Sequence, residues 1–155
     1  MKEATLTIMS VLLLCLCFAI PASGQLRGRK SETSTPPPIA AEIRATPAYA
    51  EVVLRKTELE SMLEELLVSY QEEFPKVRNT RYELGLLEAE LAGMGRFTKD
   101  EAGKLTLALG KLIVRRAELR TEYWIVTSKY DDTHPDTKKA KRKLEIFDKA
   151  IKDII

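Results

Sequence analysis

The sequence predicts an all-α protein built from two helical hairpins, each broken by a proline. Leu, Glu, Lys, Ala and Arg are abundant in its 155 residues, whereas Gly and Pro contribute only seven residues each, which is typical of helical proteins. Apolar residues recur three and four positions apart from Val52 onward, and the pattern returns 60 residues later. We expect the hairpins to form an elongated antiparallel coiled coil or a four-helix bundle.

The first 24 residues have the features of a secretory signal peptide. Lys2 precedes an uncharged apolar run over residues 6–20, and small residues, Ala22 and Gly24, come before Gln25. This run is shorter than the roughly 20 apolar residues of a membrane span, and the small residues fit a cleavage site. We therefore expect export to the periplasm or the exterior. An uncleaved signal anchor, which would tether the helices to the membrane, is the alternative.

Composition also limits the chemistry of the mature chain. Its only cysteines, Cys15 and Cys17, lie in the signal, so a disulfide framework, a cysteine-based metal site and a cysteine nucleophile are excluded. The sequence shows no nucleophile elbow, phosphate loop or metal-binding helix pair, and we expect neither enzyme activity nor a cofactor. A formal net charge of +2 gives no reason to expect a nucleic-acid partner.

Residues 25–41 are polar, basic or proline, and they include three consecutive prolines, Pro36 to Pro38. Such a segment has no apolar face to bury, which predicts a disordered linker. A short ligand for a proline-recognising domain is the alternative. The first hairpin is expected over residues 42–94 and the second over residues 98–155.

Proline chemistry predicts the turn of each hairpin. Proline lacks a backbone N–H and disfavours helix in the residue before it, but it suits the first turn of a new helix. Phe74 and Pro75 should therefore form the first turn, and His134 and Pro135 the second. The apolar seam of the first hairpin consists of Val52, Leu59, Leu63, Leu66, Tyr70, Val77, Thr80, Leu84, Leu87, Leu91 and Met94.

The second hairpin is expected to begin with one long helix. Thr98 and Glu101 match the capping box, which predicts a helix that starts there and runs to Tyr130, a length of about 50 Å. The seam of this helix and the next consists of Ala102, Leu105, Leu109, Leu112, Arg116, Leu119, Tyr123, Val126, Tyr130, Thr137, Ala140, Leu144, Phe147, Ile151 and Ile154. Gly103 and Gly110 flank this seam, and we expect another helix to approach closely at both.

The two hairpins match at a constant offset of 60 residues, which predicts an internal duplication. The matching pairs are Tyr70 with Tyr130, Pro75 with Pro135, Leu84 with Leu144, Leu87 with Phe147 and Leu91 with Ile151. Lys56 and Arg116 interrupt the seam at equivalent positions. Each should reach the edge of the core or meet a facing carboxylate. Replacing both by Leu is expected to raise the melting temperature and to loosen the specificity of assembly.

Three clusters are candidates for binding. His134, the single histidine, lies among Asp131, Asp132 and Asp136. These residues could hold a cation, but we favour helix capping by Asp132 or Thr133 with Asp136 at the helix dipole. The tyrosines and Trp124 could form a carbohydrate platform, although Tyr123 and Tyr130 fit the core better. The third cluster is basic and consists of Lys138, Lys139, Lys141, Arg142 and Lys143.

The basic cluster suits an anionic glycan, a lipid headgroup or an acidic protein. A solvated helix face is the alternative interpretation, since runs of charge usually face water. Basic residues near a helix N-terminus oppose the helix dipole, so helix stability alone does not explain their position.

The segment from Tyr130 through His134, Pro135 and Asp136 resembles a motif of the periplasmic coiled coils in the bacterial polysaccharide co-polymerase family, the chain-length determinants. Tyr70 to Pro75 is a weaker copy. The resemblance implies a coiled-coil module of the cell envelope. The sequence ends at Ile155 without the second membrane span of that family, so we expect only the coiled-coil module, and not chain-length control, to carry over.

The sequence thus predicts an exported, non-enzymatic coiled-coil protein that acts as a structural or protein-interaction module of the cell envelope. Its heptad faces would bind a protein partner or a second copy. The alternative is a periplasmic or secreted protein that binds an anionic glycan or lipid headgroup through residues 138–143.

Overall fold

The protein is all-α over residues 39–155, the part that the computed structural model describes, and this part contains no strand. The elements in chain order are α1 (Ala41–Arg44), α2 (Pro47–Ser69), α3 (Pro75–Met94), the 3₁₀ segment η1 (Lys99–Lys104), α4 (Leu107–Thr127) and α5 (Pro135–Lys152). The expected signal peptide and most of the expected linker lie outside the described residues. Helix α1 begins at Ala41, the last residue of that linker prediction.

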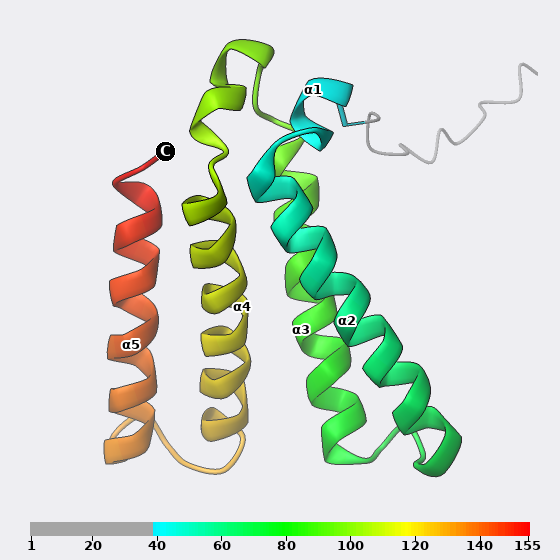
Figure 1. Ribbon diagram of the computed structural model, residues 1–155. Helices are drawn as coiled ribbons and strands as arrows, with labels where there is room; N and C mark the ends of the chain where they lie inside the picture. Colours follow the sequence, from blue (N-terminus) through cyan, green and yellow to red (C-terminus); the bar gives the residue numbers. More distant parts are fainter. Residues whose placement is uncertain (1–38) are drawn as a thin grey trace, which may run out of the picture. The chain divides into compact units, whose positions relative to one another are not determined.

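Two helical hairpins form the body of this region, α2 with α3 and α4 with α5, and each ends at a predicted turn (Figure 1). Pro75 and Pro135 occupy the first turn of α3 and α5. Phe74 and His134 precede them in extended conformation, with ψ of 131° and 139°. The all-α fold with two Pro-broken hairpins is therefore confirmed, and proline supplies its physical cause.

The long helix of each hairpin starts at an equivalent threonine. Thr46 Oγ1 accepts a hydrogen bond from the Tyr49 amide at 3.4 Å, and Thr106 Oγ1 accepts one from the Leu109 amide at 3.3 Å. Each cap satisfies a backbone donor that the first helical turn leaves free. The two hairpins therefore share their starts as well as their turns.

The prediction of one continuous helix from Thr98 to Tyr130 is wrong. The Thr98 and Glu101 capping box is present, but it opens only the 3₁₀ segment η1, and α4 starts anew at Leu107. The Leu105 carbonyl accepts a hydrogen bond from the Ala48 amide of α2 at 3.2 Å. The Thr106 hydroxyl accepts from the Leu109 amide, and the Leu105 carbonyl is bonded to α2 and not to a residue of its own helix. Because these backbone groups bond outside a continuous helix, the chain bends between η1 and α4.

The core centres on α2, α3 and α4. Helix α4 packs against α2, α3 and α5, whereas α5 packs chiefly against α4 (Figure 1). The main apolar cluster consists of Ile43, Ala48, Val52, Leu59, Leu84, Leu87, Leu91, Met94, Leu105, Leu109, Ile113, Ala117 and Ile151. Only Ile151 comes from α5, so the second hairpin is buried mainly through its first helix.

Several seam predictions are wrong at the ends of the helices. Tyr70, Tyr130 and Ile154 are 47%, 45% and 39% exposed. The two tyrosines leave the seam because each stacks on the residue before a proline, as described below. Conversely, Ile113 and Ala117 are buried although the predicted seam omits them, because α4 contacts helices on more than one side.

The expectation of close helix approach is confirmed at Gly110 and wrong at Gly103. A Cβ atom on Gly110 would lie 2.8 Å from the Ala48 Cα atom of α2, a distance that no side chain tolerates. A Cβ on Gly103 would meet nothing within 4 Å, because this glycine lies in the exposed segment η1. Glycine at 110 therefore sets how closely α2 and α4 approach.

Among the described residues, no helix combines the length and the apolar character needed to cross a membrane.

Candidate functional site

The two hairpin turns have the same internal structure. Tyr70 stacks on Phe74 with ring centroids 4.1 Å apart, and Tyr130 stacks on His134 at 4.0 Å, with interplanar angles of 9° and 10°. The Phe74 amide donates to the Gln71 carbonyl at 3.0 Å. The His134 amide donates to the Asp131 carbonyl at 3.2 Å. The predicted turn residues thus orient the helices that follow.

The acidic turn of the second hairpin caps a helix, but not through the residues that the sequence suggested. His134 itself is the N-cap of α5, and its Nδ1 atom accepts from the Asp136 amide at 3.2 Å. Asp131 accepts hydrogen bonds from the Thr133 hydroxyl and amide and from the His134 amide. These bonds, led by the one from the hydroxyl, hold the pKa of Asp131 below its ordinary value. The described residues contain no cluster suited to a metal ion.

The outer face of α5 collects most of the predicted basic cluster around a shallow groove of about 440 Å³. We define the α5 face as the residues that line it, Pro135, Lys138, Lys139, Arg142, Lys143 and Ile146. Lys141 is exposed on the same helix but does not line the groove. Ile146 is 66% exposed, and an apolar side chain surrounded by cations is typical of a binding surface.

The charges of the α5 face lack internal compensation. Within residues 39–155, Lys143 is the only member of the basic cluster with a carboxylate inside 4 Å, Glu122 at 3.8 Å. The whole helix carries seven basic and three acidic residues. Its apolar side faces α4, where Thr137, Ala140 and Ile151 are buried. Positive potential is therefore concentrated on the side of α5 that faces solvent.

Helix α2 carries the opposite charge, with five acidic and two basic residues. Near its C-terminal end, Glu64, Glu65 and Val68 are all exposed, and Val68 is the most exposed large apolar residue, at 86%. We define these three residues as the α2 face. The sequence pattern pointed to the α5 cluster but missed the α2 face, because its charges fall at ordinary outer positions of a heptad.

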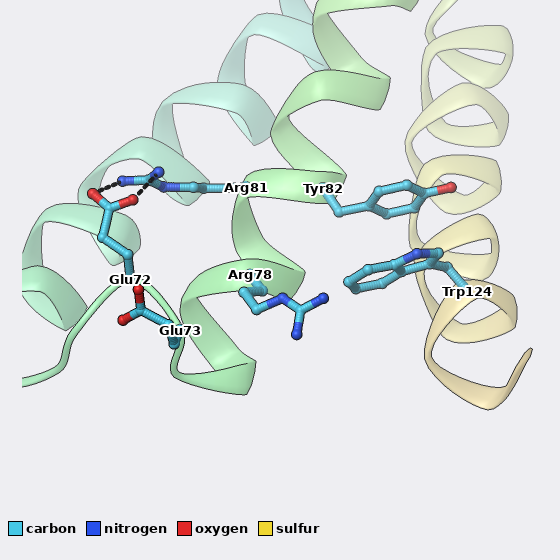
Figure 2. A pocket seen from close by; sticks show the side chains of 6 residues that line it. All are labelled: Glu72, Glu73, Arg78, Arg81, Tyr82 and Trp124. Atoms are coloured by element: carbon cyan, nitrogen blue, oxygen red, sulfur yellow. Dashed lines mark hydrogen bonds and ion pairs between the residues drawn. The ribbon is translucent and has the colours of Figure 1, made fainter. Parts of the chain in front are cut away.

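The contacts of α2 and α3 with α4, which we call the junction, join the two hairpins. Tyr82 of α3 stacks on Trp124 of α4 with ring centroids 4.6 Å apart, and the Arg78 guanidinium lies 5.8 Å from the Trp124 ring (Figure 2). A neighbouring pocket of about 310 Å³ is lined by Pro75, Arg78, Asn79, Trp124, Ile125, Ser128 and Lys129. Stacking and the cation–π contact make this an apolar, ordered contact. The aromatic pair serves here as a helix contact.

An open pocket of about 490 Å³ lies at the junction, and Figure 2 shows the side chains that line it. Its rim includes Glu72 and Glu73, and both nitrogens of the Arg81 guanidinium fork donate to the Glu72 carboxylate. This ion pair closes the first turn onto α3. The pocket therefore presents two carboxylates, the paired Arg81 and the Arg78 guanidinium beside the Trp124 ring, so its acidic and basic side chains are equal in number.

Ion pairs connect the helices of the core region. Arg55 of α2 reaches Glu83 of α3 at 2.8 Å and Glu118 of α4 at 3.5 Å. Burial opposes the charged form of Arg55, but the two carboxylates outweigh it and raise the pKa of the guanidinium. Arg55 therefore fixes α2 against both neighbouring helices.

The two basic residues that interrupt the seam both meet carboxylates. Lys56 pairs with Glu60 on its own helix and with Glu88 of α3 at 3.6 Å. Arg116 is more enclosed, and it pairs with Glu90 of α3 at 2.7 Å and with Asp148 of α5 at 3.4 Å. Arg116 is thus a link between the two hairpins, whereas Lys56 stays within the first.

Three features therefore distinguish this chain: the basic α5 face, the acidic α2 face and the junction between the two hairpins. A comparison with protein-family models, with curated proteins and with solved structures finds no match to the chain.

Proposed function

We propose that the protein is an exported, non-enzymatic helical module that binds another protein through the α5 face and acts structurally in the cell envelope. The observation that carries the proposal is the combination of exposed Ile146 with the cations around it, of which only Lys143 has a carboxylate within 4 Å in residues 39–155. Protein-binding surfaces commonly pair an apolar centre with a charged rim. The three-four spacing of the seam supports coiled-coil packing as the mode of association.

The envelope setting rests on two features of the sequence. The apolar run followed by Ala22 and Gly24 supports export. The turn around His134 and Pro135 resembles that of periplasmic coiled coils, which supports a comparable setting. Determining the N-terminus of the mature protein tests export: a chain that begins near Gln25 supports cleavage, and a membrane-bound chain that retains Met1 supports the signal anchor.

Photo-cross-linking tests whether the α5 face binds a protein. A photoreactive amino acid replaces Lys139 on the α5 face, and a matched control replaces Lys141, which is exposed on the same helix but outside the groove. Irradiation in cells that make the protein should produce protein adducts from position 139 and far fewer from position 141. Equal labelling from both positions, or no protein adduct from either, would contradict the proposal.

An anionic glycan or lipid headgroup is the second candidate for the same surface. Four cations around one groove favour it, since such a groove concentrates anions. Sedimentation with vesicles of anionic lipid, and binding to an anionic polysaccharide, would test this candidate. Binding that falls steeply between about 50 mM and about 500 mM salt, together with no protein adduct at position 139, would favour it over the protein partner.

A further inference from the structure

The junction between the two hairpins is not two-fold symmetric. Helices α2 and α3 of the first hairpin both pack on α4, but α5 does not pack on α2 in return. The ion pair between Arg55 and Glu118 shows the same asymmetry. Arg55 of the first hairpin reaches Glu118 of the second, whereas the equivalent Arg115 pairs with Glu118 and Glu122 of its own helix and does not reach Glu58. Such a heterologous contact can be repeated by a further unit, whereas a two-fold contact closes on itself.

Each hairpin therefore has one surface that takes part in the junction and one equivalent surface that does not. Shifting the α3 side by 60 residues places Pro75, Arg78, Asn79 and Tyr82 on Pro135, Lys138, Lys139 and Arg142, which line the open groove of the α5 face. The same shift places Leu86, which packs against the core, on Ile146 of that groove. Shifting the α4 side back places Trp124, Ile125 and Ser128 on Glu64, Glu65 and Val68, which form the α2 face. The two unoccupied surfaces are thus the counterparts of the two halves of the junction.

The counterparts are complementary in charge. The stacked pair Tyr82 and Trp124 becomes Arg142 opposite Glu64, and the contact of Arg78 with Trp124 becomes Lys138 opposite Glu64.

The same holds for the contact between α2 and α4. The ion pair of Arg55 with Glu118 becomes Arg115 opposite Glu58, and both of these are exposed. These translated contacts place opposite charges together, whereas the ion pair of Arg116 with Glu90 becomes Lys56 opposite Ala150. Two exposed apolar residues, Ile146 and Val68, lie in the same surfaces.

We infer that copies of this chain associate head to tail, with the α5 face of one copy on the α2 face of the next, in the geometry of the internal junction. This inference rests on the proposed function and names its partner as a second copy. Because repeating units bury their open faces against neighbours, a chain with two hairpins and two unoccupied ends would extend into a ring or a filament.

The association between copies should be weaker than the junction within a chain. At the internal junction Gly110 lies against Ala48, and its missing Cβ allows the close approach of α2 and α4. The counterpart of Gly110 is Ala50, which would meet Ala108 of the other copy, and both alanines are exposed. The extra methyl groups hold the helices further apart, so charge pairs contribute more of the attraction, and salt should weaken it.

Sedimentation velocity on the purified full chain tests the inference over a range of concentrations and salt. Wild type should form larger species as concentration rises, and raising salt from about 50 mM to about 500 mM should raise the dissociation constant roughly tenfold or more. Two charge-reversal variants, Glu64→Lys with Glu65→Lys, and Lys138→Glu with Arg142→Glu, should each remain monomeric. Circular dichroism and thermal melts establish that each variant is folded.

Mixing the two charge-reversal variants is the decisive experiment. A copy with a reversed α2 face and a copy with a reversed α5 face again present opposite charges to each other, so an equimolar mixture should associate. Reversing Lys141 and Lys152, which are exposed outside the groove, is the matched control for net charge and should leave association intact.

Several outcomes would overturn the inference: a wild type that stays monomeric at low salt, reversed variants that still associate, or a mixture that does not recover. A monomeric wild type that nevertheless gives protein adducts at position 139 would overturn only the second copy as partner. The proposed function itself fails if position 139 gives no protein adduct.

Discussion

Helices α3 and α5 occupy the same place in their hairpins, yet one is covered and the other is open. Helix α3 lies against α2 and α4, and it buries Val77, Thr80, Leu84, Leu87, Leu91 and Met94. Helix α5 packs chiefly on α4 and buries only Thr137, Ala140 and Ile151. The outer positions differ accordingly, with Tyr82 of α3 at the junction and Arg142 of α5 in the groove. The outer side chains of α3 and α5 thus differ according to whether another helix covers them.

The largest loss of stability should appear on truncating Leu87, whose equivalent in the second hairpin is Phe147. Leu87 is fully buried, whereas Phe147 is partly exposed. Leu87→Ala should cost about 3 kcal/mol of unfolding free energy, because it removes buried apolar area and leaves a cavity. Phe147→Ala should cost about 1 to 2 kcal/mol, because its neighbours can relax toward solvent. Urea unfolding at low protein concentration measures both values.

Equal losses at the two positions would show that α5 is as enclosed as α3 and would remove the basis of the comparison. Ser61→Ala on the exposed side of α2 provides a control, and it should change stability by less than about 0.5 kcal/mol.

The second prediction concerns the glycine that sets the approach of the two hairpins. Gly110→Ala should destabilise the fold by about 1 to 3 kcal/mol, because the new methyl group would overlap the α2 backbone at Ala48. Gly85 in α3 is the matched control, since a Cβ there would meet nothing within 4 Å. Gly85→Ala should stabilise the protein by about 1 kcal/mol through helix propensity. Thermal melts that rank the two variants in the opposite order would contradict the close approach.

The third prediction separates Lys56 from Arg116. The sequence predicts a higher melting temperature when both become Leu, but the observed contacts restrict that gain to Lys56, whose partners Glu60 and Glu88 are largely exposed. Arg116→Leu should cost about 1 to 2 kcal/mol, because Glu90, which is 21% exposed, would lose its cation and Asp148 would keep only Arg120 at 3.8 Å. Lys56→Leu should leave stability unchanged or slightly raised. Chemical denaturation of the two single variants measures both changes in stability, and an equal gain for the two would contradict the different roles of Lys56 and Arg116.

Much of the architecture could be predicted from local chemistry. Proline fixed both turns, and the apolar spacing identified Val52, Leu59, Leu84 and Leu87 as core residues. These features depend on residues close together in the chain, where backbone geometry and periodicity act directly. The basic cluster could also be read from the sequence, but its exposure required knowing that α5 has a neighbour on one side only.

The missed features depend on contacts between distant segments. The break before α4 arises because α2 takes the Leu105 carbonyl, and the seam alone carries no sign of that contact. The 60-residue offset did contain a clue, since it places Thr106 on Thr46, a threonine followed by Pro47. The same offset, applied to Trp124, would have identified Glu64 on the α2 face. Glu64 and Trp124 differ in side-chain type, and Leu107 stands where the first hairpin has Pro47, so a search for matching residues passed over both features.

The smallest predicted effect compares the turns, where Asp131 in the second corresponds to Gln71 in the first. Because hydrogen bonds lower the pKa of Asp131 in the folded state, its carboxylate stabilises the turn above the ordinary aspartate pKa of about 4. That contribution is lost as pH falls through the lower, folded-state pKa. The amide resonances of Thr133 and His134, which donate to this carboxylate, should shift in that acidic range. The Phe74 amide, bonded to the Gln71 backbone carbonyl, should not. Asp131→Asn should abolish the shift at Thr133, and a shift that survives this substitution would assign the titration to another group.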